Sequence, residues 1–69
     1  LLAQRLATLT PREREVLEGI IQGKANKAIA YDLGTSVRTV ETHRANLLHK
    51  LKVRAVADLV RMILPLRQP

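Results

Sequence analysis

The sequence lacks several residue types that small domains use to support a weak core. Its 69 residues contain no cysteine, no phenylalanine and no tryptophan, and Tyr31 is the single aromatic residue. Missing thiols exclude a disulfide framework and a cysteine-ligated metal site, and two histidines alone cannot form a structural metal site. No apolar run approaches the ~18 residues that span a bilayer. We therefore expect no metal, no cofactor and no membrane segment, and an aliphatic core of closely packed helices.

Catalytic residue sets are also missing. His43 and His49 are six residues apart, so on one helix their side chains project in different directions and cannot share a metal ion. The chain contains no evident nucleophile–base set and no paired carboxylates placed for acid–base work. Its three glycines are isolated, which excludes a glycine-rich phosphate loop. The sequence predicts that the domain is not an enzyme.

Positive charge gathers in the middle of the chain. The formal net charge is +6, yet residues 1–23 balance three arginines against three glutamates. Residues 24–54 hold seven basic residues and two acidic ones, and residues 55–69 add a net charge of +1. This distribution is typical of a polyanion-binding surface on a neutral scaffold. A solvated basic face that only keeps the domain soluble is the alternative interpretation.

Helix start and stop signals divide the chain. Thr10, Pro11 and Glu13 predict a capping box that opens a helix ending at Gly23. Asn26 is expected to cap a short second helix ending at Gly34, and Ser36 a third helix over about residues 37–52. Each helix turns apolar residues inward: Val16, Leu17, Ile20 and Ile21 in the first, and Ile29, Ala30 and Leu33 in the second. A three-residue turn with a glycine between a short and a longer helix indicates a helix-turn-helix.

The third helix has two faces of different character. One is apolar, with Val40, Leu47 and Leu51, and Leu48 at its margin. The opposite face suits a DNA major groove, because it mixes donors, an acceptor, a methyl and a small residue; it holds Arg38, Glu41, Thr42, Ala45, His49 and Lys52. One flank is suited to phosphate contacts and holds Thr39, His43, Asn46 and Lys50. Arg44 lies near the buried edge without an assigned role.

A last helix is expected from about Val56 to Leu64, ended by Pro65. Its apolar residues cover more than the stripe that one core contact needs, which favours a dimer surface. The residues assigned to that surface are Val56, Leu59, Val60, Met62 and Ile63. Residues 1–8 have no helix cap and are interpreted as the end of an interdomain linker. Residues 9–65 form the predicted domain and residues 66–69 a C-terminal tail.

Several short stretches, taken together, are specific enough to indicate a family. They are Leu9-Thr10-Pro11-Arg12-Glu13-Arg14-Glu15-Val16-Leu17, Asn26-Lys27-Ala28-Ile29-Ala30 and Arg38-Thr39-Val40-Glu41-Thr42-His43-Arg44-Ala45-Asn46-Leu47, with Gly23, Leu33, Lys50-Leu51 and Val53-Arg54 around them. Over residues 9 to about 63 the chain resembles the LuxR-type DNA-binding domain, most closely the FixJ and NarL branch of bacterial response regulators. Ala55 and Val37 depart from it, standing where the family often has a Ser or Asn cap and a Pro or Glu.

The resemblance implies an all-α, compact four-helix domain containing a helix-turn-helix. It also implies a third helix that lies in the major groove of double-stranded DNA and a homodimer formed on DNA through the last helix. The expected base-reading residues are Arg38, Glu41, Thr42 and Ala45, and the expected backbone contacts are Asn26, Lys27, Ser36, Thr39, His43, Asn46 and Lys50. An upstream receiver domain, RNA polymerase as a partner and a bacterial cytoplasmic location follow from the same resemblance.

Two other functions stay open at this point. Region four of bacterial sigma factors has a similar Leu-Thr-Pro-Arg-Glu-Arg opening and also binds DNA, although the apolar last helix favours the LuxR-type interpretation. A basic helical protein–protein adaptor belongs to a different class, and its basic face would meet an acidic protein. Dependence of DNA binding on salt and sequence distinguishes these functions.

Overall fold

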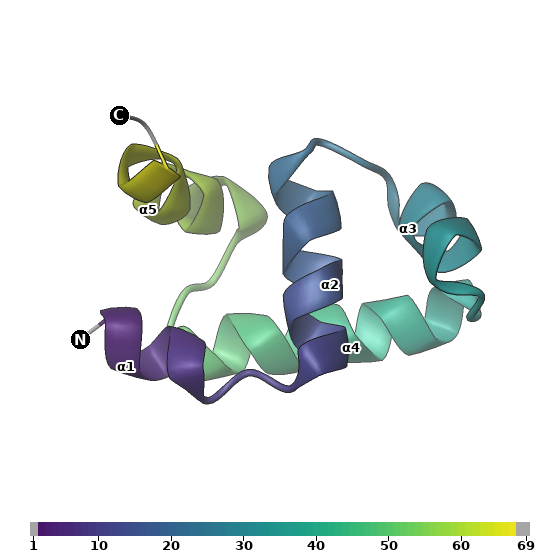
Figure 1. Cartoon of the computed structure of the whole chain (residues 1–69), viewed down its shortest axis with the longest axis horizontal. Coiled ribbons are helices and arrows are strands. Elements are labelled where there is room, and N and C mark those ends of the chain that lie inside the picture. The colour runs from purple at the N-terminus through teal and green to yellow at the C-terminus, as the bar shows by residue number, and fades with distance from the viewer. Residues whose placement is uncertain (1, 68–69) are drawn as a thin grey trace.

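Helix α4 (Val37–Lys50) is the longest helix of the domain and lies along its lower edge in the view of Figure 1. The computed structural model describes residues 2–67, and within them every regular element is a helix. Helix α2 (Pro11–Ile21) stands across α4, and α3 (Asn26–Leu33) packs at one end of α4. Helices α1 (Leu2–Ala7) and α5 (Val56–Arg67) lie toward the other end. The expected all-α class is confirmed, with one helix more than the four that were expected.

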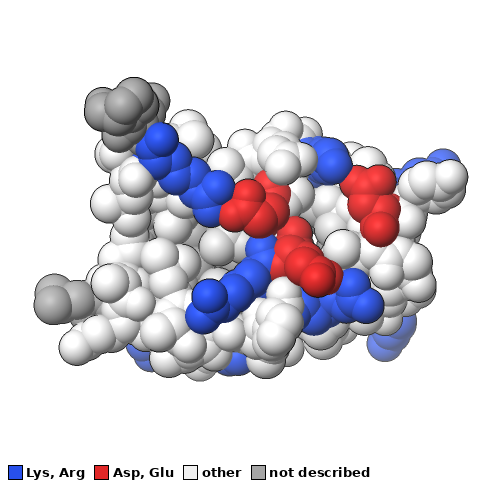
Figure 2. Space-filling view, in the orientation of Figure 1, with Lys and Arg blue, Asp and Glu red and all other residues white. Residues whose placement is uncertain are grey.

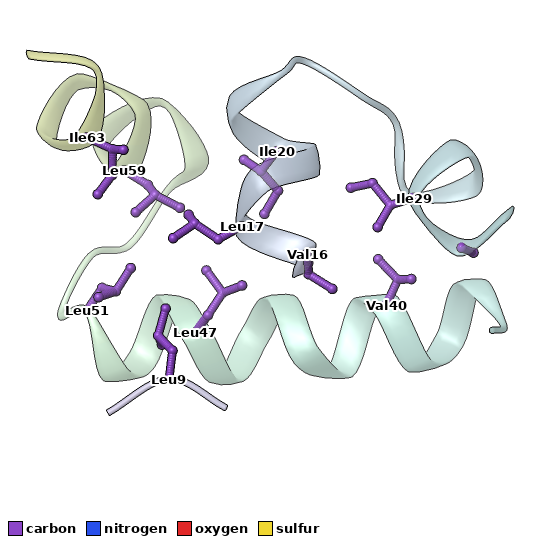
Figure 3. Close-up of a cluster of buried hydrophobic side chains, with 11 residues drawn as sticks. Leu9, Val16, Leu17, Ile20, Ile29, Val40, Leu47, Leu51, Leu59 and Ile63 are labelled. Atoms are coloured by element: carbon purple, nitrogen blue, oxygen red, sulfur yellow. The ribbon is translucent and has the colours of Figure 1, made fainter. Parts of the chain in front are cut away.

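The core lies between α4 and the three helices above it (Figure 3). Val40 and Leu47 of α4 and Leu51, which follows its last residue, are completely buried, as the apolar face predicted. The other core residues are Leu9, Val16, Leu17, Ile20, Ile29, Ala30, Leu59 and Ile63. Ile21 and Leu33 are only half-buried at its margin. Because one side of α4 is fully occupied by this core, its other side is left to solvent.

Two of the three expected helix caps are present. Thr10 Oγ1 accepts a hydrogen bond from the Glu13 amide at 3.1 Å, and Glu13 Oε1 accepts one from the Thr10 amide at 2.9 Å. This reciprocal capping box starts α2. Ser36 Oγ accepts from the Thr39 amide at 3.1 Å and starts α4. Gly34 ends α3 with φ 67°, in the left-handed region that favours glycine.

The prediction that Asn26 caps α3 is wrong. Ala25 holds the cap position without a side-chain bond, and Asn26 is the first residue of the helix. Its amide oxygen instead accepts a hydrogen bond from Arg44 Nη1 at 2.8 Å. Asn26 therefore ties α3 to α4.

Both ends of the chain contain more helix than the sequence indicated. The linker expected at residues 1–8 includes α1, whose Leu2 and Leu6 pack against the core. Helix α5 does not end before Pro65 but continues to Arg67, at the cost of one backbone hydrogen bond that proline cannot donate. Residues 68–69 of the expected tail lie outside the described residues. No helix among residues 2–67 is long and apolar enough to cross a membrane.

Candidate nucleic-acid interface

The outward face of α4 gathers the four predicted base-reading residues. Arg38, Glu41, Thr42 and Ala45 are all exposed, on the side of the helix opposite the buried Val40 and Leu47. Thr39, Asn46 and His49 are exposed on the same helix. The turn of residues 34–36 joins α3 to α4, so this face belongs to the second helix of a helix-turn-helix.

The hydroxyl group of Thr42 is already engaged within the helix. Thr42 Oγ1 donates to the Arg38 carbonyl oxygen at 3.1 Å, one turn earlier. A hydroxyl has one hydrogen to donate and two lone pairs that accept. The Thr42 side chain therefore presents an acceptor and a methyl group, but no free donor, on the exposed face.

Ion pairing separates the charges of the domain into two groups. Five of the six carboxylates have a basic partner within 4.0 Å: Arg12–Glu15, Lys24–Asp32, Lys50–Glu13, Arg61–Asp58 and Arg67–Glu18. Among residues 2–67, Glu41 alone is a carboxylate without such a partner. Every acidic residue of the chain lies in this range, and the charges of the five ion pairs cancel. The net charge of +6 is therefore the sum of the unpaired basic residues and the single negative charge of Glu41.

Seven basic residues have no carboxylate within 4.0 Å in the described part of the chain, and five of them lie in the helix-turn-helix or just after it. These five are Lys27, Arg38, Arg44, Lys52 and Arg54, and the other two are Arg5 in α1 and Arg14 in α2. We call the five the free basic set. Sequence reasoning gave Arg44 and Arg54 no role, although both lie in the basic middle segment.

The face of the domain that α2 and α3 form is mixed in charge. In the view of Figure 2, Asp and Glu side chains gather over α2 and α3 among basic ones, and further Lys and Arg surface appears along the lower rim, where α4 lies. A shallow hollow between α2 and α3 is lined by four charged residues, Glu15, Glu18, Lys24 and Asp32, together with Gly19, Gln22, Ile29 and Leu33. Unbalanced positive charge is therefore concentrated in and just after the helix-turn-helix, although the unpaired Arg5 and Arg14 lie outside it.

Lys50 does not belong to that unbalanced charge. Its Nζ lies 2.7 Å from Glu13 Oε1 and 3.4 Å from the Thr8 carbonyl oxygen. The Glu13 side chain is only 4% exposed. Burial alone would raise the pKa of Glu13, but hydrogen bonds from Lys50 and Thr10 and the ammonium charge outweigh it and lower the pKa. Lys50 thus neutralises a buried carboxylate and fixes the start of α2 against the end of α4.

The remaining predicted backbone contacts divide by exposure. Lys27, Ser36, Thr39 and Asn46 are exposed, whereas Asn26 and His43 are half-buried. Ser36 and Thr39 bond to each other through their hydroxyl oxygens, 2.9 Å apart. These exposed residues lie at the beginnings of α3 and α4 and along α4.

The last helix presents a different surface from the one expected. Leu59 and Ile63 are 0% and 3% exposed, so the assignment of these two residues to a dimer surface is wrong: both point into the core of the same chain (Figure 3). Val56, Val60 and Met62 are half-buried, and Leu64 and Leu66 are the exposed large apolar residues of α5. Apolar residues lie on nearly every side of α5, so tertiary packing decides which of them remain exposed.

No group of three metal-ligating side chains occurs among the described residues. The features present are an exposed helix face, unpaired positive charge beside it and a scaffold that holds both. Together they can bind a polyanion and contact base edges.

Known proteins resemble this domain in sequence and in structure. Residues 7–63 match the sequence profile of a family described as bacterial regulatory proteins, luxR family. The transcriptional regulatory protein FixJ of Azorhizobium caulinodans is 56% identical over 61 residues, which are 88% of this chain and 29% of FixJ. UhpA of Salmonella typhimurium is 57% identical over 53 residues, covering 77% of this chain and 27% of UhpA.

Two solved structures have the same fold. The response regulator StyR superposes with a TM-score of 0.86 at 45% identity, covering 90% of this chain and 31% of StyR. Full-length FixJ from B. japonicum gives a TM-score of 0.81 at 47% identity, covering 87% of this chain and 30% of that protein. The chain spans less than a third of the length of these relatives.

Proposed function

Since this chain belongs to the luxR family of bacterial regulatory proteins, we propose that it is a sequence-specific DNA-binding domain of a transcriptional response regulator. In this proposal α4 lies in the major groove of double-stranded DNA. The observation that carries it is the free basic set in and just after the helix-turn-helix, of which all but the half-buried Arg44 are exposed, while the other basic residues of the middle segment, Lys24 and Lys50, are neutralised by carboxylates. Unneutralised lysines and arginines bind phosphates and release counterions, which is the main source of affinity for DNA.

Groups with different chemistry would divide the work of binding. Arg38, Glu41, Thr42 and Ala45 would contact base edges, because they occupy the centre of the exposed face. Lys27, Ser36, Thr39 and Asn46 would contact phosphates on either side, with Lys52 and Arg54 adding positive charge at the far end of α4. Asn26 and His43 are half-buried, and the Asn26 amide oxygen already accepts from Arg44, so we assign these two residues a smaller part in phosphate binding.

In this proposal Lys50 stabilises the fold and is not one of the DNA-contacting residues. Its ammonium group is held at 2.7 Å by the carboxylate of Glu13. Two of its three N–H donors are given to Glu13 and to the Thr8 carbonyl oxygen, and moving the ammonium group away to a phosphate would leave a buried carboxylate unpaired, which is costly.

Assembly on DNA is proposed to use α5. Leu64 and Leu66 are exposed, and Val60 and Met62 border them. One helix from each copy buries less than the ~1,200–2,000 Å² of a stable interface. We therefore expect a monomer in free solution and a homodimer on two adjacent half-sites, where DNA raises the effective concentration.

The rest of the regulator is proposed from its relatives. FixJ and StyR are response regulators or transcriptional regulators more than three times longer than the matched segment. By this likeness an upstream receiver domain would control the domain described above, RNA polymerase would be its partner at promoters, and the bacterial cytoplasm would be its location.

Salt titration with matched variants tests DNA binding. Fluorescence anisotropy with a labelled random-sequence duplex should show affinity falling steeply with salt, by about −0.9 in the log–log slope for each phosphate neutralised. Arg38→Ala should weaken binding, whereas Arg12→Ala, which removes the same charge from the Arg12–Glu15 pair on α2, should not. A salt response that is flat, or equal losses in both variants, would favour the protein–protein adaptor instead.

A further inference from the structure

Glu41 presents an electrostatic problem that a specific contact would solve. It is the one carboxylate without a basic partner within 4.0 Å among residues 2–67, and it is exposed on the face proposed to enter DNA. Near phosphates an unpaired carboxylate is repelled, so it lowers the affinity for DNA in general. This loss of affinity is compensated only where a base offers a hydrogen-bond donor to the Glu41 carboxylate.

The donors available in the major groove are the amino groups of cytosine and adenine. An ionised carboxylate only accepts hydrogen bonds. In an A·T pair the adenine amino group lies between two acceptors, its own N7 and the O4 of thymine, and both repel a carboxylate, whereas in a G·C pair the cytosine amino group has an acceptor, the O6 of guanine, on one side only. Glu41 is therefore matched to cytosine better than to adenine.

Thr42 strengthens the same preference. Because its hydroxyl hydrogen is given to the Arg38 carbonyl at 3.1 Å, its oxygen is left to accept and its methyl group to make an apolar contact. Two neighbouring residues thus present acceptors without a free donor, and both disfavour the acceptor-only groove edge of guanine.

The neighbours on the face add two further contacts. Arg38, one turn before Thr42, has donors only and no carboxylate partner, which suits the O6 and N7 acceptors of guanine. Ala45, one turn after Glu41, offers a methyl group that suits the methyl of thymine. From Arg38 to Ala45 the helix rises ~10 Å, at 1.5 Å per residue, about the length of three base pairs.

Resting on the proposed function, we infer that Glu41 is the specificity-determining residue of the domain and selects cytosine through its amino group. The acceptor-only Thr42 supports this selection. Arg38 and Ala45 read a guanine and a thymine within the same three-base-pair step. Glu41 lowers affinity for every duplex that lacks the amino group at that position.

Selection from a randomised duplex library tests the inference, using the wild type, Glu41→Gln and Glu15→Gln. Both variants lose one negative charge, but Glu15 is paired with Arg12 on α2 and serves as the matched control. The wild type should enrich a motif with a fixed cytosine. Glu41→Gln should change that cytosine to adenine, because an amide can donate to N7 as well as accept from the amino group. The exchange should alter the preference at that position about tenfold.

Affinity for a random-sequence duplex is the second readout. Glu41→Gln should bind it more tightly than the wild type, and Glu15→Gln should match the wild type. Thr42→Val keeps the shape without the acceptor and should weaken the preference for the same cytosine. Thr42→Ser keeps the acceptor and should retain the preference.

The outcomes separate this inference from the proposed function. If the wild type binds no duplex, DNA binding itself is refuted. If the wild type binds DNA in a salt-dependent way but enriches no motif, or if the motif of Glu41→Gln equals that of the wild type, DNA binding stands and the assignment of Glu41 is overturned. Equal gains in random-duplex affinity for Glu41→Gln and Glu15→Gln would also overturn it, because net charge alone would then explain the gain.

Discussion

Replacing Lys50 with methionine decides between its two possible roles. The sequence assigned Lys50 to the phosphate-contacting flank of α4, but its Nζ lies 2.7 Å from a Glu13 carboxylate that is 4% exposed. Lys50→Met keeps most of the aliphatic stem and removes the charge and the donors. In the variant the Thr10 amide still donates to Glu13, yet the buried negative charge has lost its neutralising partner.

The size of the loss follows from the exposure of the pair. Breaking a fully buried ion pair costs about 3–5 kcal/mol, and a hydrogen bond to a charged group contributes about 1.5–3 kcal/mol. The Lys50 side chain is 33% exposed, so water reaches the site and the lower part of these ranges applies. We expect a fall in the free energy of unfolding of about 2 kcal/mol, which lowers Tm by roughly 8–16 °C in a domain of this size.

Urea unfolding and salt titration of DNA binding, on the same samples at 10 °C, separate the two roles. Lys50→Met should lose stability and keep the salt slope of the wild type. Lys27→Met is the matched control, because Lys27 is exposed and has no carboxylate within 4.0 Å; it should change stability by less than ~0.5 kcal/mol and reduce the slope by about 0.9.

A double-mutant cycle checks the partner. Glu13→Gln combined with Lys50→Met should cost less than the sum of the two changes, because each alone leaves the other group unpaired. Full stability of Lys50→Met together with a reduced salt slope would refute the scaffold role and restore Lys50 to the DNA contacts.

Further predictions concern other parts of the domain. A Cβ at Gly19 would lie 2.6 Å from Ile29 Cγ1, so Gly19→Ala should destabilise the domain by about 1–3 kcal/mol in urea unfolding and combine with Ile29→Ala at less than the sum. Lys52 has φ 60°, so Lys52→Gly should raise the stability by up to ~1 kcal/mol while weakening DNA binding through the lost charge. Leu64→Asp should leave half-site binding intact and abolish cooperative filling of a double site in a gel-shift assay. The unfolding free energy should fall as the pH drops below the ordinary Glu13 pKa of 4.5 toward its lowered value in the fold, because the ionised form is the one that the fold stabilises; Glu13→Gln should flatten this part of the pH profile.

The helices could be predicted from the sequence where their signals are local. The capping box of α2, the Ser36 cap and the left-handed Gly34 each depend on residues within one turn of the chain, and the structure has all three. Helix α1 carries no cap signal and forms where Leu2 and Leu6 can pack on the core. Pro65 is a local signal for the end of a helix, but tertiary contacts override it. Arg67 Nη1 donates to Glu18 Oε2 at 3.0 Å and holds the end of α5 against α2.

The packing of α5 could not be predicted from the sequence, because it too depends on tertiary contacts and not on local signals. Its sequence is apolar on several faces, so periodicity alone does not say which face meets α2. The fold chooses Leu59 and Ile63 for the core and leaves Leu64 and Leu66 exposed. A helix with an ambiguous stripe is oriented by its partners and not by its own pattern.

Charge neutralisation is the part of the site that depends most on the tertiary structure. In the sequence, residues 24–54 hold seven basic residues, and nothing there distinguishes those that pair with a carboxylate from those that do not. In the fold, Lys50 meets Glu13 from 37 residues away and Lys24 meets Asp32 from 8 residues away, while Arg38, Lys27 and Glu41 acquire no ion-pair partner. A carboxylate that folding leaves unpaired on a cationic face weakens binding to any polyanion, and only a sequence with a matching donor repays that loss. On this argument, Glu41 lowers the overall affinity of the domain for DNA and at the same time lets it discriminate between DNA sequences. The other five carboxylates cannot act in this manner, because each is already paired with a basic residue.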